Sequence, residues 1–116
     1  MALELRVRNG ESTPELRDYV ERRLGFALGR FGSRVGRVTV SLEDLNGPRG
    51  GLDQRCRIAV SLVPSGKVIA EATDLEVFAA VNRAAERIAR RVRSEFDRRR
   101  ATRKLGSTRE PNSPEA

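Results

Sequence analysis

Apolar and polar residues alternate in four short stretches of the chain. Alternation with a period of two is typical of a strand that buries one face. It occurs over residues 3–7, 37–42, 55–62 and 67–72. Between the first two stretches, Thr13 is a suitable N-cap and Pro14 a suitable first residue for a helix, which we expect to end near Phe31.

A second helical pattern follows the last strand. Asp74 is placed to cap it, and apolar residues recur at helical spacing from residue 75 to residue 100. The apolar stripe comprises Phe78, Val81, Ala85, Ile88, Ala89, Val92 and Phe96. At 1.5 Å per residue this helix is about 39 Å long. A four-stranded sheet is narrower, so we expect the end of the helix to project past the body.

The pattern predicts an α+β fold of order β-α-β-β-β-α, with a four-stranded sheet and two helices packed on one face. The other face of the sheet is predicted to be polar and rich in arginine: Glu4, Arg6, Arg8, Arg37, Thr39, Ser41, Arg55, Arg57, Lys67 and Glu71. Residues 43–53 read as a Gly/Pro-rich loop. We assign residues 1–104 to one domain and residues 105–116, which contain two prolines, to a disordered tail.

The charge is concentrated in one segment. The chain has 116 residues and a formal net charge of +7, and 21 of its 23 basic residues are arginine. Residues 83–104 hold ten basic and three acidic residues, so the other residues sum to zero. Opposite the apolar stripe of the second helix lie Arg83, Arg87, Arg90, Arg91 and Arg98. A local basic surface indicates a polyanionic partner, with a merely solvated arginine-rich helix as the alternative.

The residue types exclude several kinds of chemistry. Without histidine there is no Ser-His-Asp or Cys-His nucleophile system and no imidazole metal site. The glycine-rich stretches lack the residues and the following helix of a phosphate loop. The carboxylates Glu43, Asp44 and Asp53 do not have the spacing of a calcium loop. We therefore expect no enzymatic activity, no metal, no cofactor and no small-molecule substrate.

The single cysteine and the hydropathy of the chain bear on its compartment. Cys56 lies on the inward side of its predicted strand and reads as a small buried hydrophobic residue. No stretch has the length and apolarity of a membrane span or a signal peptide. We expect a cytoplasmic protein with no membrane partner.

The aromatic residues argue against base stacking as the main mode of binding. Tyr19, Phe31, Phe78 and Phe96 fall on the predicted core stripes, and Phe26 does not. Guanidinium groups remain, and these pair with phosphate oxygens. Recognition of the RNA backbone and its shape is therefore expected, rather than recognition of sequence.

Several motifs occur in a consistent order along the chain. Arg8-Asn9 follows the first strand, Thr-Pro-Glu-Leu-Arg-Asp-Tyr-Val occupies residues 13–20, Arg22-Arg23-Leu24 follows, and residues 71–75 and 79–88 lead into the second helix. Over residues 3–100 the chain resembles the ribosome hibernation promoting factors, also called ribosome-associated inhibitor A or sigma-54 modulation proteins. It departs from that family at Phe78, Asn82 and Glu86 and in a longer loop at residues 46–51.

The resemblance implies the fold of a double-stranded-RNA-binding domain and a partner, the small ribosomal subunit. Members occupy the channel used by mRNA and tRNA and silence translation under stress, with basic side chains against ribosomal RNA. The matching positions, with Arg98 added from the charge pattern, are Arg8, Arg22, Arg23, Arg83, Arg87, Arg90, Arg91 and Arg98. The chain resembles the short form, which lacks a dimerisation domain, so we expect a monomer. A general RNA-binding module and a protein-interaction module that do not act on the ribosome stay open as alternatives.

Overall fold

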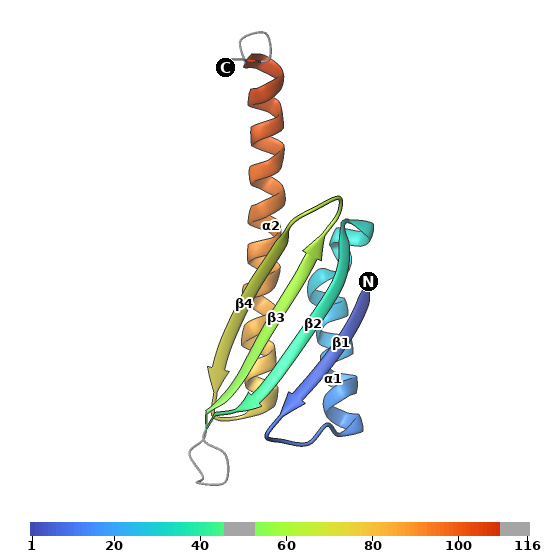
Figure 1. The fold of residues 1–116 in the computed structure, drawn as a ribbon, viewed down its shortest axis with the longest axis vertical. Helices are drawn as coiled ribbons and strands as arrows, with labels where there is room; N and C mark the ends of the chain where they lie inside the picture. The colour runs from blue at the N-terminus through green and yellow to red at the C-terminus, as the bar shows by residue number, and fades with distance from the viewer. Residues whose placement is uncertain (46–52, 110–116) are drawn as a thin grey trace.

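The structure is a computed structural model that describes residues 1–45 and 53–109, with residues 104–109 described by their backbone alone. Its elements are β1 (Ala2–Arg8), α1 (Pro14–Leu28), the 3-10 helix η1 (Gly29–Arg34), β2 (Val35–Asp44), β3 (Gln54–Leu62), β4 (Lys67–Asp74) and α2 (Val77–Arg109). This order confirms the predicted β-α-β-β-β-α fold (Figure 1).

The four strands form one sheet in the order β1-β2-β3-β4. β1 is parallel to β2, which α1 makes possible as a crossover, and the other neighbours are antiparallel. Both helices lie behind the same face of the sheet in Figure 1, as the sequence predicts. The opposite face has no covering element among the described residues.

The core fills the space between the sheet and the helices. The strands contribute alternate residues, among them Val38, Val40, Leu42, Cys56, Ile58 and Val60. No polar or charged side chain of the described residues is buried there. Burial raises the pKa of the Cys56 thiol to about 12, because an apolar environment disfavours the thiolate. Cys56 is therefore the buried, unreactive residue that its position in the alternation predicts.

The first helix ends earlier than its apolar spacing suggests. The α-helix ends at Leu28, and η1 carries the chain through Phe31, which the sequence placed at the helix end. Gly32 adopts φ 58° and ψ −134°, a conformation that glycine reaches without the Cβ clash of other residues. Phe31 stays buried despite the break, and its ring centroid lies 5.8 Å from that of Phe96.

The second helix begins and ends later than predicted. Asp74 is the last residue of β4 rather than an N-cap, and its carboxylate accepts a hydrogen bond from the Glu76 backbone N–H at 3.4 Å. The helix runs past residue 100 to Arg109 and is about 50 Å long. The first proline after it in the sequence is Pro111, so no proline interrupts the helix before Arg109.

The predicted tail and loop are described only in part. α2 includes residues 105–109 of the predicted tail, and residues 110–116 lie outside the described residues, so the tail and the domain boundary stay predictions. β2 extends through Glu43 and Asp44, which pair with β3, so the predicted loop begins later than residue 43. Residues 46–52, with the predicted Asn-Gly turn, lie outside the described residues.

Phe78 is the one residue of the predicted apolar stripe that is not covered. It lies in the first turn of α2 and is 40% exposed. Its ring meets the ring of Tyr19 on α1 edge-on, with centroids 5.0 Å apart. The first turn lies at the end of the body, where α1 is its neighbour, so helical spacing alone overestimates how much of Phe78 is buried.

Truncating Phe96 tests the packing of α2 against η1. Phe96→Ala removes a buried ring that contacts Phe31, and we expect it to lower the free energy of unfolding by roughly 3 kcal/mol. Phe26→Ala is the matched control, because Phe26 is 83% exposed and its loss should change stability by less than about 0.5 kcal/mol. Urea denaturation followed by circular dichroism measures both, and equal losses would contradict this packing.

Candidate nucleic-acid interface

The basic side of α2 lies along the free edge of β4. α2 packs its apolar stripe on β4 and β3, so the arginines beside the stripe follow the outer edge of the sheet. A shallow groove between the helix and this edge is lined by Val68, Ile69, Ala70, Glu71, Arg87, Arg90, Arg91, Ser94, Glu95 and Arg98. The helical phase predicted from the sequence is correct, because the five candidate arginines of α2 are exposed.

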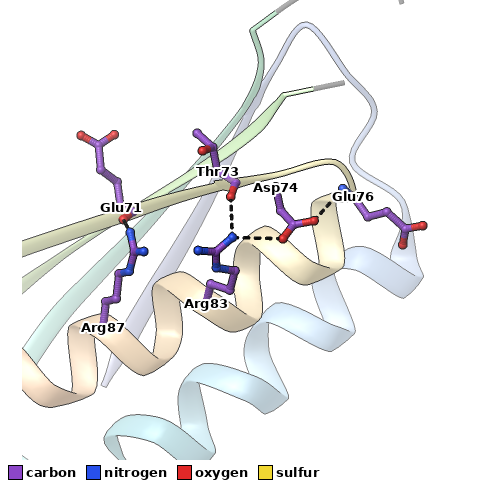
Figure 2. A network of polar contacts seen from close by, with 6 residues as sticks. All are labelled: Glu71, Thr73, Asp74, Glu76, Arg83 and Arg87. Carbon is purple, nitrogen blue, oxygen red and sulfur yellow. Dashed lines mark hydrogen bonds and ion pairs between the residues drawn. The ribbon is translucent and has the colours of Figure 1, made fainter. Parts of the chain in front are cut away.

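Two of these arginines hydrogen-bond to the edge of the sheet, as Figure 2 shows. Arg83 donates from Nη1 to the Thr73 carbonyl at 3.2 Å and to the Asp74 carboxylate at 3.3 Å. Arg87 donates from Nη1 to the Glu71 carbonyl at 2.8 Å. β4 is an edge strand, so these carbonyls have no strand partner. The two arginines thus protect an edge that otherwise invites pairing with another chain.

Arg90 and Arg91 are exposed one turn further along α2 and differ from Arg83 and Arg87 in their contacts. Within the described part of the chain, neither side chain has a hydrogen bond or an ion pair. Both line the groove beside β4, and Arg90 also borders a second depression between α1 and α2. Their guanidinium groups can bind an anion without giving up a bond inside the protein.

Arg98 belongs to a local cluster of charges. It pairs with Glu95, and Arg99 pairs with the same carboxylate at 3.0 Å while donating to the Ser65 carbonyl at 2.7 Å. The hydrogen bond from Arg99, and next the one from Arg98, lower the pKa of Glu95. Because Arg99 is held by two partners, Arg98 is the more exposed arginine of this cluster.

The two candidates on α1 are held in different ways. Arg23 donates from Nε to Asn82 Oδ1 at 2.7 Å, and this bond connects α1 to α2. Arg22 faces solvent and pairs with Asp18 at 3.6 Å on the same helix, an exposed pair that adds little stability. Arg22 is therefore available for a partner, whereas Arg23 would first have to break its hydrogen bond to Asn82.

Arg8 does not join the other candidates. It ends β1 and lies on the uncovered face of the sheet, beside Arg6 and Arg57. The eight candidate residues thus fall on two surfaces: seven on the side of the helices and Arg8 on the opposite side. The alternation of exposed and half-buried residues along β1 fixes this separation, and it agrees with the polar sheet face predicted for Arg8 from the sequence.

Further arginines gather where α2 leaves the body and were not among the candidates. The guanidinium of Arg34 stacks 4.5 Å from the ring centroid of Phe96, and that of Arg30 lies 5.3 Å from Phe31. Arg93 and Arg100 border the same small depression. The Arg-Phe-Gly-Ser-Arg sequence of η1 was the available signal, but the first helix was expected to end near Phe31, with no 3-10 helix after it.

Other kinds of site find little support in the described residues. Among them, no group of three or more Cys, Asp or Glu side chains is arranged to hold a metal ion. No described helix combines the length and the apolarity that crossing a bilayer requires.

These features define a class of protein: an α+β domain of β-α-β-β-β-α order whose net positive charge comes from arginines on its surface. Residues 3–100 match the family described as Sigma 54 modulation protein / S30EA ribosomal protein, and the chain belongs to this family. The resemblance found in the sequence motifs is thereby confirmed.

Solved structures agree with this assignment. The N-terminal domain of protein Y from Thermus thermophilus is 33% identical, with a TM-score of 0.66 over 79% of this chain and 96% of that chain. A ribosomal subunit interface protein from Coxiella burnetii is 15% identical, with a TM-score of 0.69 over 84% of this chain and 98% of that chain, and supports the fold alone. A search of curated protein sequences finds no match.

Replacing the edge-binding arginines should cost stability, whereas replacing the free arginines should not. Arg83→Ala with Arg87→Ala removes the hydrogen bonds to β4, and we expect a loss of about 1 kcal/mol because these bonds are exposed. The matched pair Arg90→Ala with Arg91→Ala removes the same charge and should leave stability within about 0.5 kcal/mol of the wild type. Thermal unfolding decides, and equal melting temperatures for both double variants would disprove the structural role of Arg83 and Arg87.

Acidification should weaken the end of β4. The backbone hydrogen bond from Glu76, with that from the Arg83 side chain, lowers the pKa of Asp74 from its ordinary value of 3.8. A lowered pKa favours the folded state above pH 3.8, and this contribution disappears as the pH falls through the lowered value. Asp74→Asn should therefore be less stable than the wild type at pH 7 and equal to it once Asp74 is protonated. A stability difference independent of pH would contradict this linkage.

Proposed function

We propose that this protein binds the ribosome and restrains translation by occupying the mRNA and tRNA channel of the small subunit. The observation that carries the proposal is the exposed pair Arg90 and Arg91, free of internal partners among the described residues, on a member of the S30EA family. The description of the family includes a ribosomal protein, which supports the ribosome as partner.

Contacts between arginine and phosphate supply the binding energy in this proposal. Arg22, Arg90, Arg91 and Arg98 project from the helices without holding separate elements together. Arg23, Arg83 and Arg87 first have to release hydrogen bonds to Asn82 or β4, so they contribute less. A guanidinium fork fits two phosphate oxygens and reads no base, which suits a partner recognised by shape.

The surface available for base stacking is small. Among the described aromatic residues, only Phe26 and Phe78 are exposed, and Phe78 already contacts Tyr19. We therefore assign the protein a mode of binding through the RNA backbone. We further propose that it acts as a non-enzymatic monomer in the cytoplasm. Ordered rRNA presents fixed phosphate positions, so the ordering cost on binding comes from the arginine side chains, at about 0.5 to 1.5 kcal/mol each.

Salt dependence is the first test of this mechanism. If six to ten phosphates are neutralised, affinity for the small subunit should fall by roughly 10³ to 10⁵-fold between 50 and 200 mM salt. Co-sedimentation of the protein with ribosomes on sucrose gradients measures this fall. A flat salt response would rule out phosphate contacts, and displacement by excess free duplex RNA would favour a general RNA-binding module.

A pair of single charge reversals locates the contact. Arg91→Glu should weaken ribosome binding roughly tenfold and reduce the slope of log affinity against log salt by about one. Arg17→Glu is the matched control, because Arg17 is also an exposed helical arginine but lies on α1 away from the groove. Equal weakening by both changes would show that net charge, rather than the groove, governs binding.

A further inference from the structure

The uncovered face of the sheet forms a second basic surface, separate from the groove beside α2. Its charged residues come from all four strands. The basic ones are Arg6, Arg8, Arg37, Arg55, Arg57 and Lys67, and the acidic ones are Glu4, Glu43 and Glu71. They surround an open depression on this face. The surface has an excess of three positive charges, so its charge is not balanced locally.

The carboxylates are used by only two of the six cations. Arg6 pairs with Glu4 at 3.0 Å, and Arg55 pairs with Glu43 at 2.7 Å and with Glu71 at 3.8 Å. The cations left without an ion pair among the described residues are Arg8, Arg37, Arg57 and Lys67. These four groups are exposed and free to meet an anion.

The strand register places three of the free cations, Arg37, Arg57 and Lys67, in two rows across the sheet, and the paired Arg6 joins one of them. Arg37 and Lys67 share one row, since Ser61 pairs with Lys67 and its hydroxyl accepts the Arg37 N–H. Arg6 and Arg57 share the other row, because both are register partners of Ser41. Ser41 lies four residues beyond Arg37 on β2, which separates the rows by about 13 Å at 3.3 Å per residue.

The floor between the two rows is low and partly hydroxylated. Thr39 and Ala59 are register partners there, and Ala59 pairs in turn with Ile69. On the β1 side Thr39 pairs with Glu4, whose carboxylate is bound by Arg6. Thr39, Ser41 and Ser61 place hydroxyl groups on this face. A-form RNA presents a wide, shallow minor groove with phosphates along both sides and 2′-hydroxyls between them. Two cationic rows flanking a floor with hydroxyl groups match that arrangement.

We propose that the uncovered sheet face binds an A-form RNA duplex across its minor groove, with Arg37 and Arg57 on phosphates of the two strands. This goes beyond the proposed function and shares with it only RNA as the partner. A protein partner fits less well, because interface cores favour aromatic anchors and disfavour charge. None of the exposed large hydrophobic residues in the described part of the chain lies in this depression.

The two basic surfaces lie on opposite sides of a thin body. Figure 1 is viewed along the shortest axis, with the sheet in front of the helices, and the Cα atoms extend 17 Å along that axis. The depressions of the two surfaces adjoin at the β4 edge, where Ile69 lines both. Arg37 and Arg57 line only the depression on the sheet face, and Arg90 and Arg91 do not line it, so substitutions at these pairs test the two surfaces separately.

Binding of a short duplex tests this proposal. We expect native mass spectrometry and sedimentation at low salt to show an RNA duplex of about 16 base pairs bound to the chain. Arg37→Glu with Arg57→Glu should abolish this binding or reduce its salt slope by about two. Arg90→Glu with Arg91→Glu is the matched control, since it changes the charge equally beside α2 and should leave the duplex bound to the sheet.

The other outcomes overturn the proposal. They are unchanged duplex binding after the sheet-face reversal, loss of the duplex in the helix-side control, a wild type that binds no duplex, and equal affinity for poly-glutamate. Equal affinity for a B-form DNA duplex would likewise contradict recognition of the A-form groove. If the sheet-face variant unfolds, Arg37→Gln with Arg57→Gln gives the same test without introducing repulsion. Ribosome co-sedimentation of the helix-side variant decides the proposed function separately.

Discussion

The close packing of α2 on β4 is the contact on which the arrangement of surface charge depends. Small residues face each other across it: Ala80 and Ala84 on the helix and Ala70 and Ala72 on the strand are buried. Small side chains allow a helix to lie near a sheet, and arginines flanking the apolar stripe then reach the strand edge. Arg83 and Arg87 contact the carbonyls of β4, and Arg99 contacts the turn before it. Larger side chains in place of these alanines would move the helix outward. The arginine contacts to β4 would then break before the packing of the apolar stripe was disturbed.

This packing divides the arginines into two groups with different roles. Those that bond to backbone or across helices, such as Arg23 and Arg87, lower the cost of an exposed strand edge or hold α1 to α2. Those without internal partners in the described residues, such as Arg91 and Arg57, leave their charge for a polyanion. A chain of net charge +7 therefore keeps an apolar core. No charge is buried in the described part, and many of its arginines are paired at the surface.

The strands, the sheet faces and the phase of α2 follow directly from the sequence, because alternation and helical spacing report which side of an element is buried. The end of α1 at Leu28 does not, since the apolar spacing continues to Phe31 while the backbone changes to the 3-10 helix η1 after Leu28. The different roles of Arg87 and Arg91 could not be predicted from the sequence. Both lie next to the apolar stripe, and only the position of β4 shows that Arg87 bonds to a strand carbonyl while Arg91 lines the groove. Arg8 was grouped with the helix arginines through the family resemblance, although the alternation of its strand already placed it on the opposite, polar face of the sheet.

The projecting end of α2 shows how charge can replace packing. Beyond Phe96 the helix leaves the sheet (Figure 1), so burial no longer supports it. Glu95 pairs with Arg99, and Asp97 pairs with Arg100, each carboxylate preceding its arginine along the helix, the favourable order for such pairs. The arginines of these pairs therefore stabilise the helix that presents them. In the proposed function, a phosphate bound there would add to that stability by relieving repulsion among Arg98, Arg100 and Arg103.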